Sequence, residues 1–255
     1  MGLTDTHTHL YLEQFKDDVD LVIKNAISAD ISRFFLPAIS SKYTDSMLDL
    51  KEKYPKNIFL MSGLHPCYVD VNYQDEILHI EETISNNKDI VAIGEIGVDL
   101  YWDKSNLNMQ LKAFKRQIKL ANECNLPIVI HCRDSFDEIY KVLNETPSKN
   151  GGIFHCFTGT IEQANKIIAL GMKIGIGGVV TFKNGKIDKF LNKIGIENIV
   201  LETDSPYLSP SPNRGKRNES KNIKFVADKL SDIYSLSLKE IAHITTKNSK
   251  QVFGI

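Results

Sequence analysis

Residues 127–131 read Pro-Ile-Val-Ile-His, a short apolar run that ends in a histidine. Residues 31–36 read Ile-Ser-Arg-Phe-Phe-Leu, a second short run rich in apolar side chains. Runs of this length and composition are typical of parallel strands that are buried on both faces. We therefore expect a parallel sheet, with a polar side chain where the strand at 127–131 ends.

The same plan recurs along the whole chain. Residues 107–124 place apolar side chains three and four positions apart, which indicates an amphipathic helix, and residues 134–145 and 160–170 do the same. The runs that we expect as strands are residues 3–8, 31–37, 57–63, 89–95, 127–131, 152–156, 172–177 and 198–203. About eight strand–helix units predict an α/β fold, a single (β/α)8 TIM barrel over residues 1–255.

Local signals mark the ends of two of the helices. Gly171 stands where the helix at 160–170 needs a C-terminal cap. Ser237 and Glu240 have the spacing of a capping box, which predicts a C-terminal helix over 238–248.

An open, doubly wound sheet would also alternate strands with helices. It would scatter residues at the ends of strands 1, 4, 5, 6 and 8 across its width, whereas a closed ring brings them to one axis. Barrel enzymes carry their active sites at the C-terminal ends of the strands. Because the candidate functional residues lie at those ends, we favour the barrel.

Composition limits the classes of function. The chain has 255 residues, 42% of them hydrophobic, and a formal net charge of −1, which argues against coating nucleic acid through bulk positive charge. An enzyme that takes a nucleic-acid end into a pocket stays possible. The four cysteines suggest no disulfide framework. With no apparent signal peptide or membrane span, we expect a cytoplasmic protein.

Six residues of metal-ligand type end the expected strands. Because side chains alternate along a strand, His7 and His9 should point to the same side. Imidazole suits several transition-metal ions, and a carboxylate can bridge two ions about 3.5–4 Å apart. Strands 8 and 1 are neighbours in a ring, as are strands 5 and 6. We therefore expect two ions that share Glu95, one on His7, His9 and Asp204 and the other on His131 and His155.

Four further residues are candidates for substrate handling. Glu202 should share the inward face of its strand with Asp204, where it would support a metal ligand or act as an auxiliary base, although a solvated loop acid would look the same. Arg133 suits phosphate recognition, or else caps a helix or forms an ion pair. His65 is a candidate contact to substrate or leaving group. Arg214 begins a basic loop that either holds phosphates or is simply solvated.

Some neighbouring residues allow two interpretations. Asp99 could orient a metal ligand or cap a turn. Tyr101 and Trp102 could stack a base or cover the barrel. Cys132 and Cys156 each follow a candidate ligand, so alternation predicts that they face the helix layer.

As a set, these motifs resemble the TatD family of metal-dependent deoxyribonucleases, in the amidohydrolase-like barrel superfamily. The resemblance covers the whole chain, in order, at residues 5–10 (Asp-Thr-His-Thr-His-Leu), 63–66 (Gly-Leu-His-Pro), 94–99 (Gly-Glu-Ile-Gly-Val-Asp), 127–133, 155–159, 201–208 and 214–219. It implies a two-metal barrel hydrolase that acts on DNA, often as a Mg²⁺-dependent 3′ exonuclease. It also implies the same six ligand positions.

We therefore expect an enzyme, a deoxyribonuclease that cleaves phosphodiesters with water activated by two divalent ions (Mg²⁺, Zn²⁺ or Mn²⁺). Asp204 could bind one ion and also accept a proton from the attacking water. Its substrates would be DNA or nucleotide ends, with no membrane and no obligatory protein partner. The alternatives are an ester or amide hydrolase of the same superfamily, such as a D-aminoacyl-tRNA deacylase, and a metal-containing binding protein that is not an enzyme.

Overall fold

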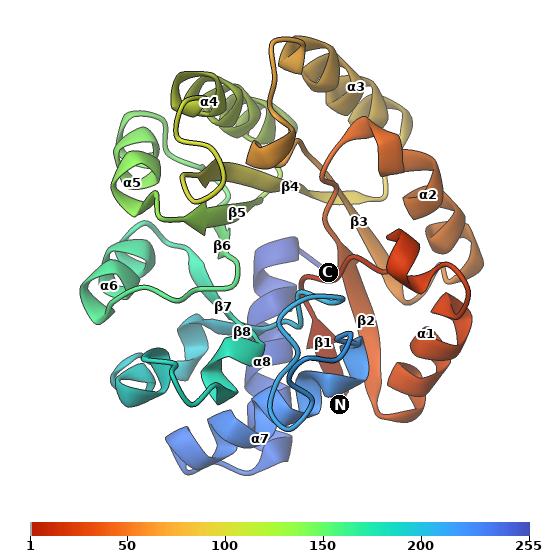
Figure 1. The fold of residues 1–255 in the computed structure, drawn as a ribbon, viewed down its shortest axis with the longest axis vertical. Coiled ribbons are helices and arrows are strands. Elements are labelled where there is room, and N and C mark those ends of the chain that lie inside the picture. Colours follow the sequence, from red (N-terminus) through yellow and green to blue (C-terminus); the bar gives the residue numbers. More distant parts are fainter. Residues whose placement is uncertain (1) are drawn as a thin grey trace.

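A computed structural model describes residues 2–255 and contains one eight-stranded parallel sheet, with strands in the order β1 to β8 (Figure 1). The strands are β1 Leu3–Asp5, β2 Ile31–Leu36, β3 Ile58–Ser62, β4 Ile90–Asp99, β5 Ile128–Arg133, β6 Gly152–Phe154, β7 Lys173–Ile176 and β8 Ile199–Leu201. The predicted TIM barrel is confirmed, and all eight predicted strands are present.

Most of the helices surround the strands on the outside of the ring, whereas the last one packs against β1 and β8 behind the centre of the view (Figure 1). They are α1 Val19–Ser28, α2 Thr44–Lys53, α3 Tyr73–Asn86, α4 Leu107–Cys124, α5 Phe136–Glu145, α6 Ile161–Ala169, α7 Ile223–Tyr234 and α8 Leu238–Phe253. Between β7 and β8 the described chain forms four short 3₁₀ turns instead of an α-helix. Among residues 2–255, no helix combines the length and the apolarity that a membrane crossing requires.

The ring closes through residues at or just beyond the ends of β1 and β8. Thr6 N–H donates to the carbonyl of Leu201 at 3.0 Å, and Asp204 N–H donates to the carbonyl of His7 at 2.9 Å. Thr8 and Ser205 form a further parallel bridge. The seam of the barrel therefore holds three of the expected metal ligands, His7, His9 and Asp204, on hydrogen-bonded backbone.

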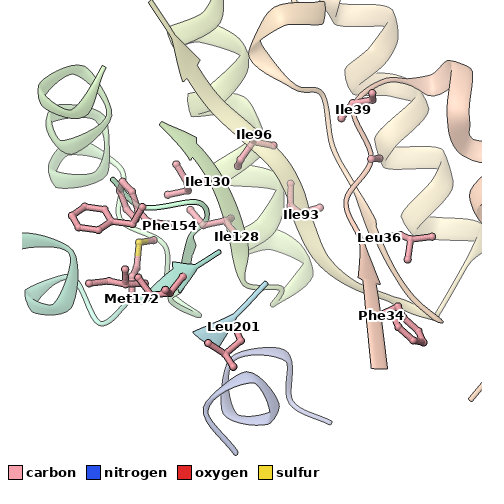
Figure 2. Close-up of a cluster of buried hydrophobic side chains, with 14 of the residues drawn as sticks. Phe34, Leu36, Ile39, Ile93, Ile96, Ile128, Ile130, Phe154, Met172 and Leu201 are labelled. Atoms are coloured by element: carbon pink, nitrogen blue, oxygen red, sulfur yellow. The ribbon is translucent and has the colours of Figure 1, made fainter. Parts of the chain in front are cut away.

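Apolar side chains cover both faces of the strands. The outward face packs beneath the helices and includes Phe34, Ile128 and Ile130 (Figure 2). The alternate residues form a smaller cluster inside the ring, which we call the interior layer. Its members are Phe35, Met61, Ala92, Val129, Ile153, Val200 and Phe253.

The last helix is longer than predicted, because it contributes to this interior layer. The sequence suggested an end at residue 248, but α8 continues to Phe253, whose ring stacks on Phe35 with 4.1 Å between centroids. Gly254, at φ 69°, ends the helix in the left-handed conformation. The predicted capping box of Ser237 and Glu240 is confirmed.

Strand β4 contains an irregularity that decides where Glu95 points. Gly94 pairs with Val129 and Ile96 pairs with Ile130, so Glu95 is an extra residue in the ladder. Its N–H donates to the carbonyl of Ala38 at 2.9 Å instead. Strict alternation from Ala92 would send Glu95 toward the helices, whereas an extra residue re-aims the side chain. The strand then runs on to Asp99, four residues past the predicted end.

Candidate metal centre

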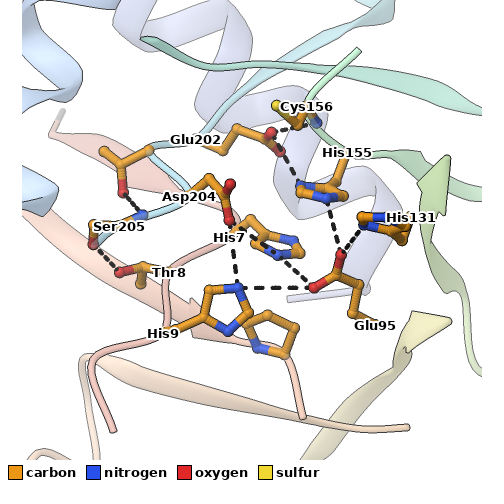
Figure 3. A network of polar contacts seen from close by, with 12 residues as sticks. His7, Thr8, His9, Glu95, His131, His155, Cys156, Glu202, Asp204 and Ser205 are labelled. Carbon is orange, nitrogen blue, oxygen red and sulfur yellow. Dashed lines mark hydrogen bonds and ion pairs between the residues drawn. The ribbon is translucent and has the colours of Figure 1, made fainter. Parts of the chain in front are cut away.

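Glu95 lies at the middle of the site, and its two oxygens face different histidines (Figure 3). Oε1 is 2.8 Å from His131 Nδ1 and 2.9 Å from His155 Nε2. Oε2 is 3.1 Å from His7 Nε2 and 3.7 Å from His9 Nε2. The carboxylate therefore divides the four imidazoles into the two pairs that the sequence suggested.

Asp204 completes the group on the Oε2 side. Its Oδ1 lies 3.4 Å from His9 Nε2 and 3.9 Å from His7 Nε2. The residue has φ 55°, and its N–H and carbonyl are both used, by His7 and by Tyr207 N–H. The closing seam of the barrel thus fixes the backbone beneath this carboxylate.

His9 is oriented by a tyrosine that the sequence analysis did not select. The hydroxyl of Tyr11 donates to the carbonyl of Pro37 at 2.6 Å and lies 2.9 Å from His9 Nδ1. Because that hydroxyl has already used its proton, its oxygen accepts from His9 Nδ1–H, and Nε2 is left free as a ligand. The sequence does contain a signal for this role, because Tyr11 follows His9 at the same two-residue spacing that separates His7 from His9.

Asp99 performs both roles that the sequence left open. Its Oδ2 lies 2.9 Å from His131 Nε2, and its Oδ1 accepts from the N–H groups of Tyr101 and Trp102 at 2.9 and 3.0 Å. A carboxylate can only accept, so His131 Nε2 carries a proton and Nδ1 faces Glu95 as the available ligand atom. Burial opposes ionisation, but the hydrogen bonds from His131 and Trp102 lower the pKa of Asp99 to about 2.

Glu202 lies behind His155 as Asp99 lies behind His131, but it makes an ion-pair contact with the ring and no hydrogen bond. Its side chain is fully buried, so the alternative of a solvated loop acid is wrong. Oε1 accepts from Cys156 N–H and lies 3.4 Å from His155 Nδ1, on the side of the ring away from Glu95. The ring of His155 also stacks on His7, with 3.8 Å between centroids.

His65 lies closer to the ligands than the sequence suggested, because β3 pairs directly with β4. Its Nε2 is 3.4 Å from Glu95 Oε1 and 3.2 Å from His131 Nδ1, within reach of an ion. However, its Nδ1 accepts from Cys67 N–H at 3.1 Å. In the neutral ring the proton therefore sits on Nε2, so His65 presents a hydrogen-bond donor where the other histidines present lone pairs.

Electrostatics in this buried cluster favour a charged Glu95. Burial opposes its ionisation, but His155, His65 and His7 hold the pKa of Glu95 well below its ordinary value. Burial and the neighbouring His155 lower the pKa of His7. The carboxylate is therefore ionised beside a His7 that keeps a lone pair, which is the protonation state that metal ligands require.

The donor set fits divalent ions. Ligand bonds of about 2.0–2.2 Å place neighbouring donor atoms roughly 3 Å apart, and the Glu95 oxygens lie 2.8–3.7 Å from the imidazole nitrogens of His7, His9, His131 and His155. Donor atoms within 4.8 Å of one another form three overlapping groups: His7, His9 and Glu95; His7, His155 and Asp204; His65, Glu95 and His131. The second group crosses the predicted partition, because His155 stacks against His7.

A cavity of about 610 Å³ opens above these ligands. Arg133 lies on its wall, as predicted for a residue that could meet phosphate, and its side chain is exposed. Cys132 and Cys156 also line the cavity, although alternation predicted that they face the helices. For Cys156 the reason is that β6 ends at Phe154, so its φ of 46° breaks the alternation.

The basic loop after β8 lies further from the centre. Arg214 stacks on Phe182, with the guanidinium 3.6 Å from the ring centroid, and donates to the carbonyl of Ser209 at 3.0 Å. It lines a second, smaller cavity of about 310 Å³. Arg217 of the same loop is bound to Asp18 and Glu219 and so has a structural role.

Comparisons with known proteins show which family the chain belongs to. A family model described as "TatD related DNase" matches residues 4–254. The uncharacterized metal-dependent hydrolase YabD of Bacillus subtilis is 38% identical over 99% of both chains. The uncharacterized metal-dependent hydrolase YcfH of Escherichia coli is 31% identical, covering 100% of this chain and 97% of its own.

The solved structures give the same result. The crystal structure of YjjV, a TatD homologue from Escherichia coli, superposes with a TM-score of 0.94 at 27% identity and covers 99% of this chain and 98% of its own. Fold and sequence therefore agree along the full length, and the chain belongs to the TatD-related family of metal-dependent hydrolases.

Proposed function

We propose that this metal-dependent hydrolase is a deoxyribonuclease that removes nucleotides from the 3′ end of DNA with two divalent ions. The observation that carries the proposal is the division of Glu95, with Oε1 toward His131 and His155 and Oε2 toward His7 and His9. One carboxylate shared by two imidazole pairs is the arrangement that a two-ion phosphodiesterase needs. The family model, whose description names DNases, supports the same substrate class.

His7, His9 and Asp204 would hold one ion and His131 and His155 the other, with Glu95 between them. Four imidazoles among six ligands favour Zn²⁺ over Mg²⁺ and Mn²⁺, which prefer oxygen ligands. When bound, the two ions would supply a nucleophilic hydroxide at neutral pH and neutralise charge on the phosphate.

Residues of the chain would handle the protons and the substrate. Asp204 faces the cavity and accepts a proton from the attacking water. Nε2–H of His65 donates to the departing sugar oxygen, because Cys67 N–H fixes the proton on that nitrogen. Arg133 contacts the phosphate from the cavity wall. Arg214 meets a phosphate further along the strand.

The test removes metal with EDTA and restores single metals before three assays, on 3′-labelled single-stranded DNA, on RNA and on an aminoacyl ester. The proposal expects metal-dependent release of nucleotides from DNA. Cleavage of the aminoacyl ester with inert DNA would replace the nuclease by a deacylase of the same fold. Metal binding with no hydrolysis of any substrate would leave a binding protein.

A variant then tests the role of Asp204. Asp204→Asn should abolish single-turnover cleavage while DNA still binds, because the amide cannot accept the proton. Asp228→Asn, an exposed acid on α7, is the matched control and should cleave normally. Normal single-turnover cleavage by Asp204→Asn would rule out the proton-accepting role.

A further inference from the structure

Exposed aromatic side chains gather around the mouth of the metal cavity. Tyr68, Trp102 and Tyr207 all line the cavity, with exposed fractions of 43%, 70% and 48%. Tyr101, next to Trp102, is also exposed. Large aromatic rings are usually buried for stability, so a cluster that stays in solvent beside a site needs another reason.

Trp102 is held in a fixed orientation although its surface is free. Its ring meets that of Tyr101 edge-on, with 5.0 Å between centroids and 89° between planes. The guanidinium of Arg133 lies 3.9 Å from the ring centroid of Tyr101 and 5.6 Å from that of Trp102. Tyr101 and Arg133 thus hold the indole in place, and 70% of Trp102 still remains exposed, which leaves indole surface available for stacking.

The backbone of this aromatic pair is tied to the metal centre. Oδ1 of Asp99 accepts from the N–H groups of Tyr101 and Trp102, while Oδ2 of the same carboxylate holds His131. Asp99 is almost fully buried, so the link is shielded from water. The separation between Trp102 and the ligands is therefore set by one rigid side chain.

We propose that Trp102 is a stacking platform for the nucleobase beside the scissile phosphodiester, with Arg133 contacting the adjoining phosphate. The inference rests on the proposed nuclease function and adds how the substrate is recognised. Every base offers a π face, so a platform of this kind tolerates any sequence. A base can lie on Trp102 only when it is unpaired, so the enzyme selects single-stranded or frayed ends.

Trp102 is the single tryptophan of the chain, so its fluorescence reports on this position alone. The experiment titrates the purified, metal-containing protein with a single-stranded oligodeoxynucleotide whose 3′ linkages are non-hydrolysable phosphorothioates. A sugar–phosphate chain of the same length without bases is the control ligand. The proposal expects strong, saturable quenching by the first ligand and little by the second. Equal quenching by both, or quenching by neither, would overturn it.

Two substitutions separate the aromatic face from mere bulk. Stacking contributes about 1–3 kcal/mol per base, so Trp102→Leu should raise KM for the oligonucleotide about tenfold relative to KM for a small phosphodiester without a base. Trp102→Phe should restore most of that ratio. Leu78→Ala, an exposed apolar residue on α3, is the control and should change neither KM. An unchanged ratio in Trp102→Leu would exclude the platform.

The two proposals fail in different ways. Base-dependent quenching without cleavage of any DNA would remove the nuclease but retain a nucleobase site. Metal-dependent DNA cleavage without base-dependent quenching would retain the nuclease and remove the platform.

Discussion

The inward face of the barrel changes character within two residues on three of its strands. Val129, Ile153 and Val200 belong to the apolar interior layer. Two positions later the same strands, or the residues that follow them, place His131, His155 and Glu202 at the polar mouth. A side-chain period of two puts both members of each pair on the same side of the sheet.

The two regions have opposite effects on stability. Burying one large apolar side chain stabilises a fold by about 1.5–3 kcal/mol. At the mouth, by contrast, His7 Nδ1 and Glu202 Oε2 are buried without a hydrogen-bond partner, and such a group costs about 1–3 kcal/mol. The comparison indicates that the interior layer maintains the barrel, while the mouth is tolerated because it binds ions.

The largest expected effect tests the mouth. Glu95→Gln removes the charge shared by the two imidazole pairs and puts an amide among the ligands. We expect kcat to fall on the order of 10³-fold or more, with loss of bound metal. Elemental analysis after dialysis and steady-state kinetics measure both. Glu123→Gln, an exposed acid on α4, is the control. Full metal content in Glu95→Gln would contradict the bridging role.

The second effect tests the interior layer. Phe253→Ala removes the ring that stacks on Phe35 and should lower the free energy of unfolding by about 3 kcal/mol. At a temperature where the variant stays folded, kcat should match that of the unaltered protein. Denaturant unfolding measures the loss of stability, and steady-state kinetics measures kcat. Ile255→Ala, at an exposed residue of the same terminus, is the control. Loss of activity in folded Phe253→Ala would show that the two regions are coupled.

The third effect tests the support of a ligand. Tyr11→Phe keeps the ring but removes the hydroxyl that accepts from His9 and donates to Pro37. Affinity for metal should fall about 10–100-fold, as is usual when a supporting group is lost. Chelator competition measures it. Tyr234→Phe also removes a hydroxyl that donates to backbone carbonyls, but in a region distant in sequence, and should leave metal affinity unchanged. Equal affinities in both variants would refute the role of Tyr11.

The difference between the interior layer and the mouth also decides which features of the fold and the site could be predicted from the sequence. The apolar runs and the ligands that end them follow a simple alternation, which is why the barrel and the convergence of His7, His9, His131 and His155 on Glu95 could be predicted. Glu95 itself was chosen for its chemistry, because alternation from Ala92 points it the wrong way. The extra residue in β4 depends on pairing with Ala38, a contact between distant segments.

Other features also depend on tertiary contacts. The extension of α8 to Phe253 follows from packing inside the ring, which overrides the local helix signals. The proton positions on His9, His65 and His131 follow from hydrogen-bond partners up to 32 residues away. Arg217 belongs to the basic loop that begins at Arg214, but its partner Asp18, which no local pattern indicates, lies 199 residues earlier in the chain.

The ion pair between Arg217 and Asp18 differs from both regions. Its groups are polar, unlike those of the interior layer, and each has a partner, unlike His7 Nδ1 and Glu202 Oε2 at the mouth. Arg217 donates to both carboxylate oxygens of Asp18, at 2.8 and 2.6 Å, and so ties the loop after β8 to the start of α1. These hydrogen bonds hold the pKa of Asp18 below its ordinary value. A depressed pKa contributes stability above the unfolded value, about 3.9, and that stability is lost as pH falls through the folded pKa.

The smallest expected effect follows from this pair. The side chains are 37% and 30% exposed, so water screens the charges, and Asp18→Asn should cost at most about 1 kcal/mol of unfolding free energy at pH 7. The difference between the two proteins should shrink as pH falls below about 4, where Asp18 is protonated in the unfolded chain, and should vanish below its depressed pKa in the folded protein. Urea unfolding of metal-free protein from pH 7 downward measures it. A cost above that of Phe253→Ala would mean that this ion pair, and not the interior layer, dominates stability.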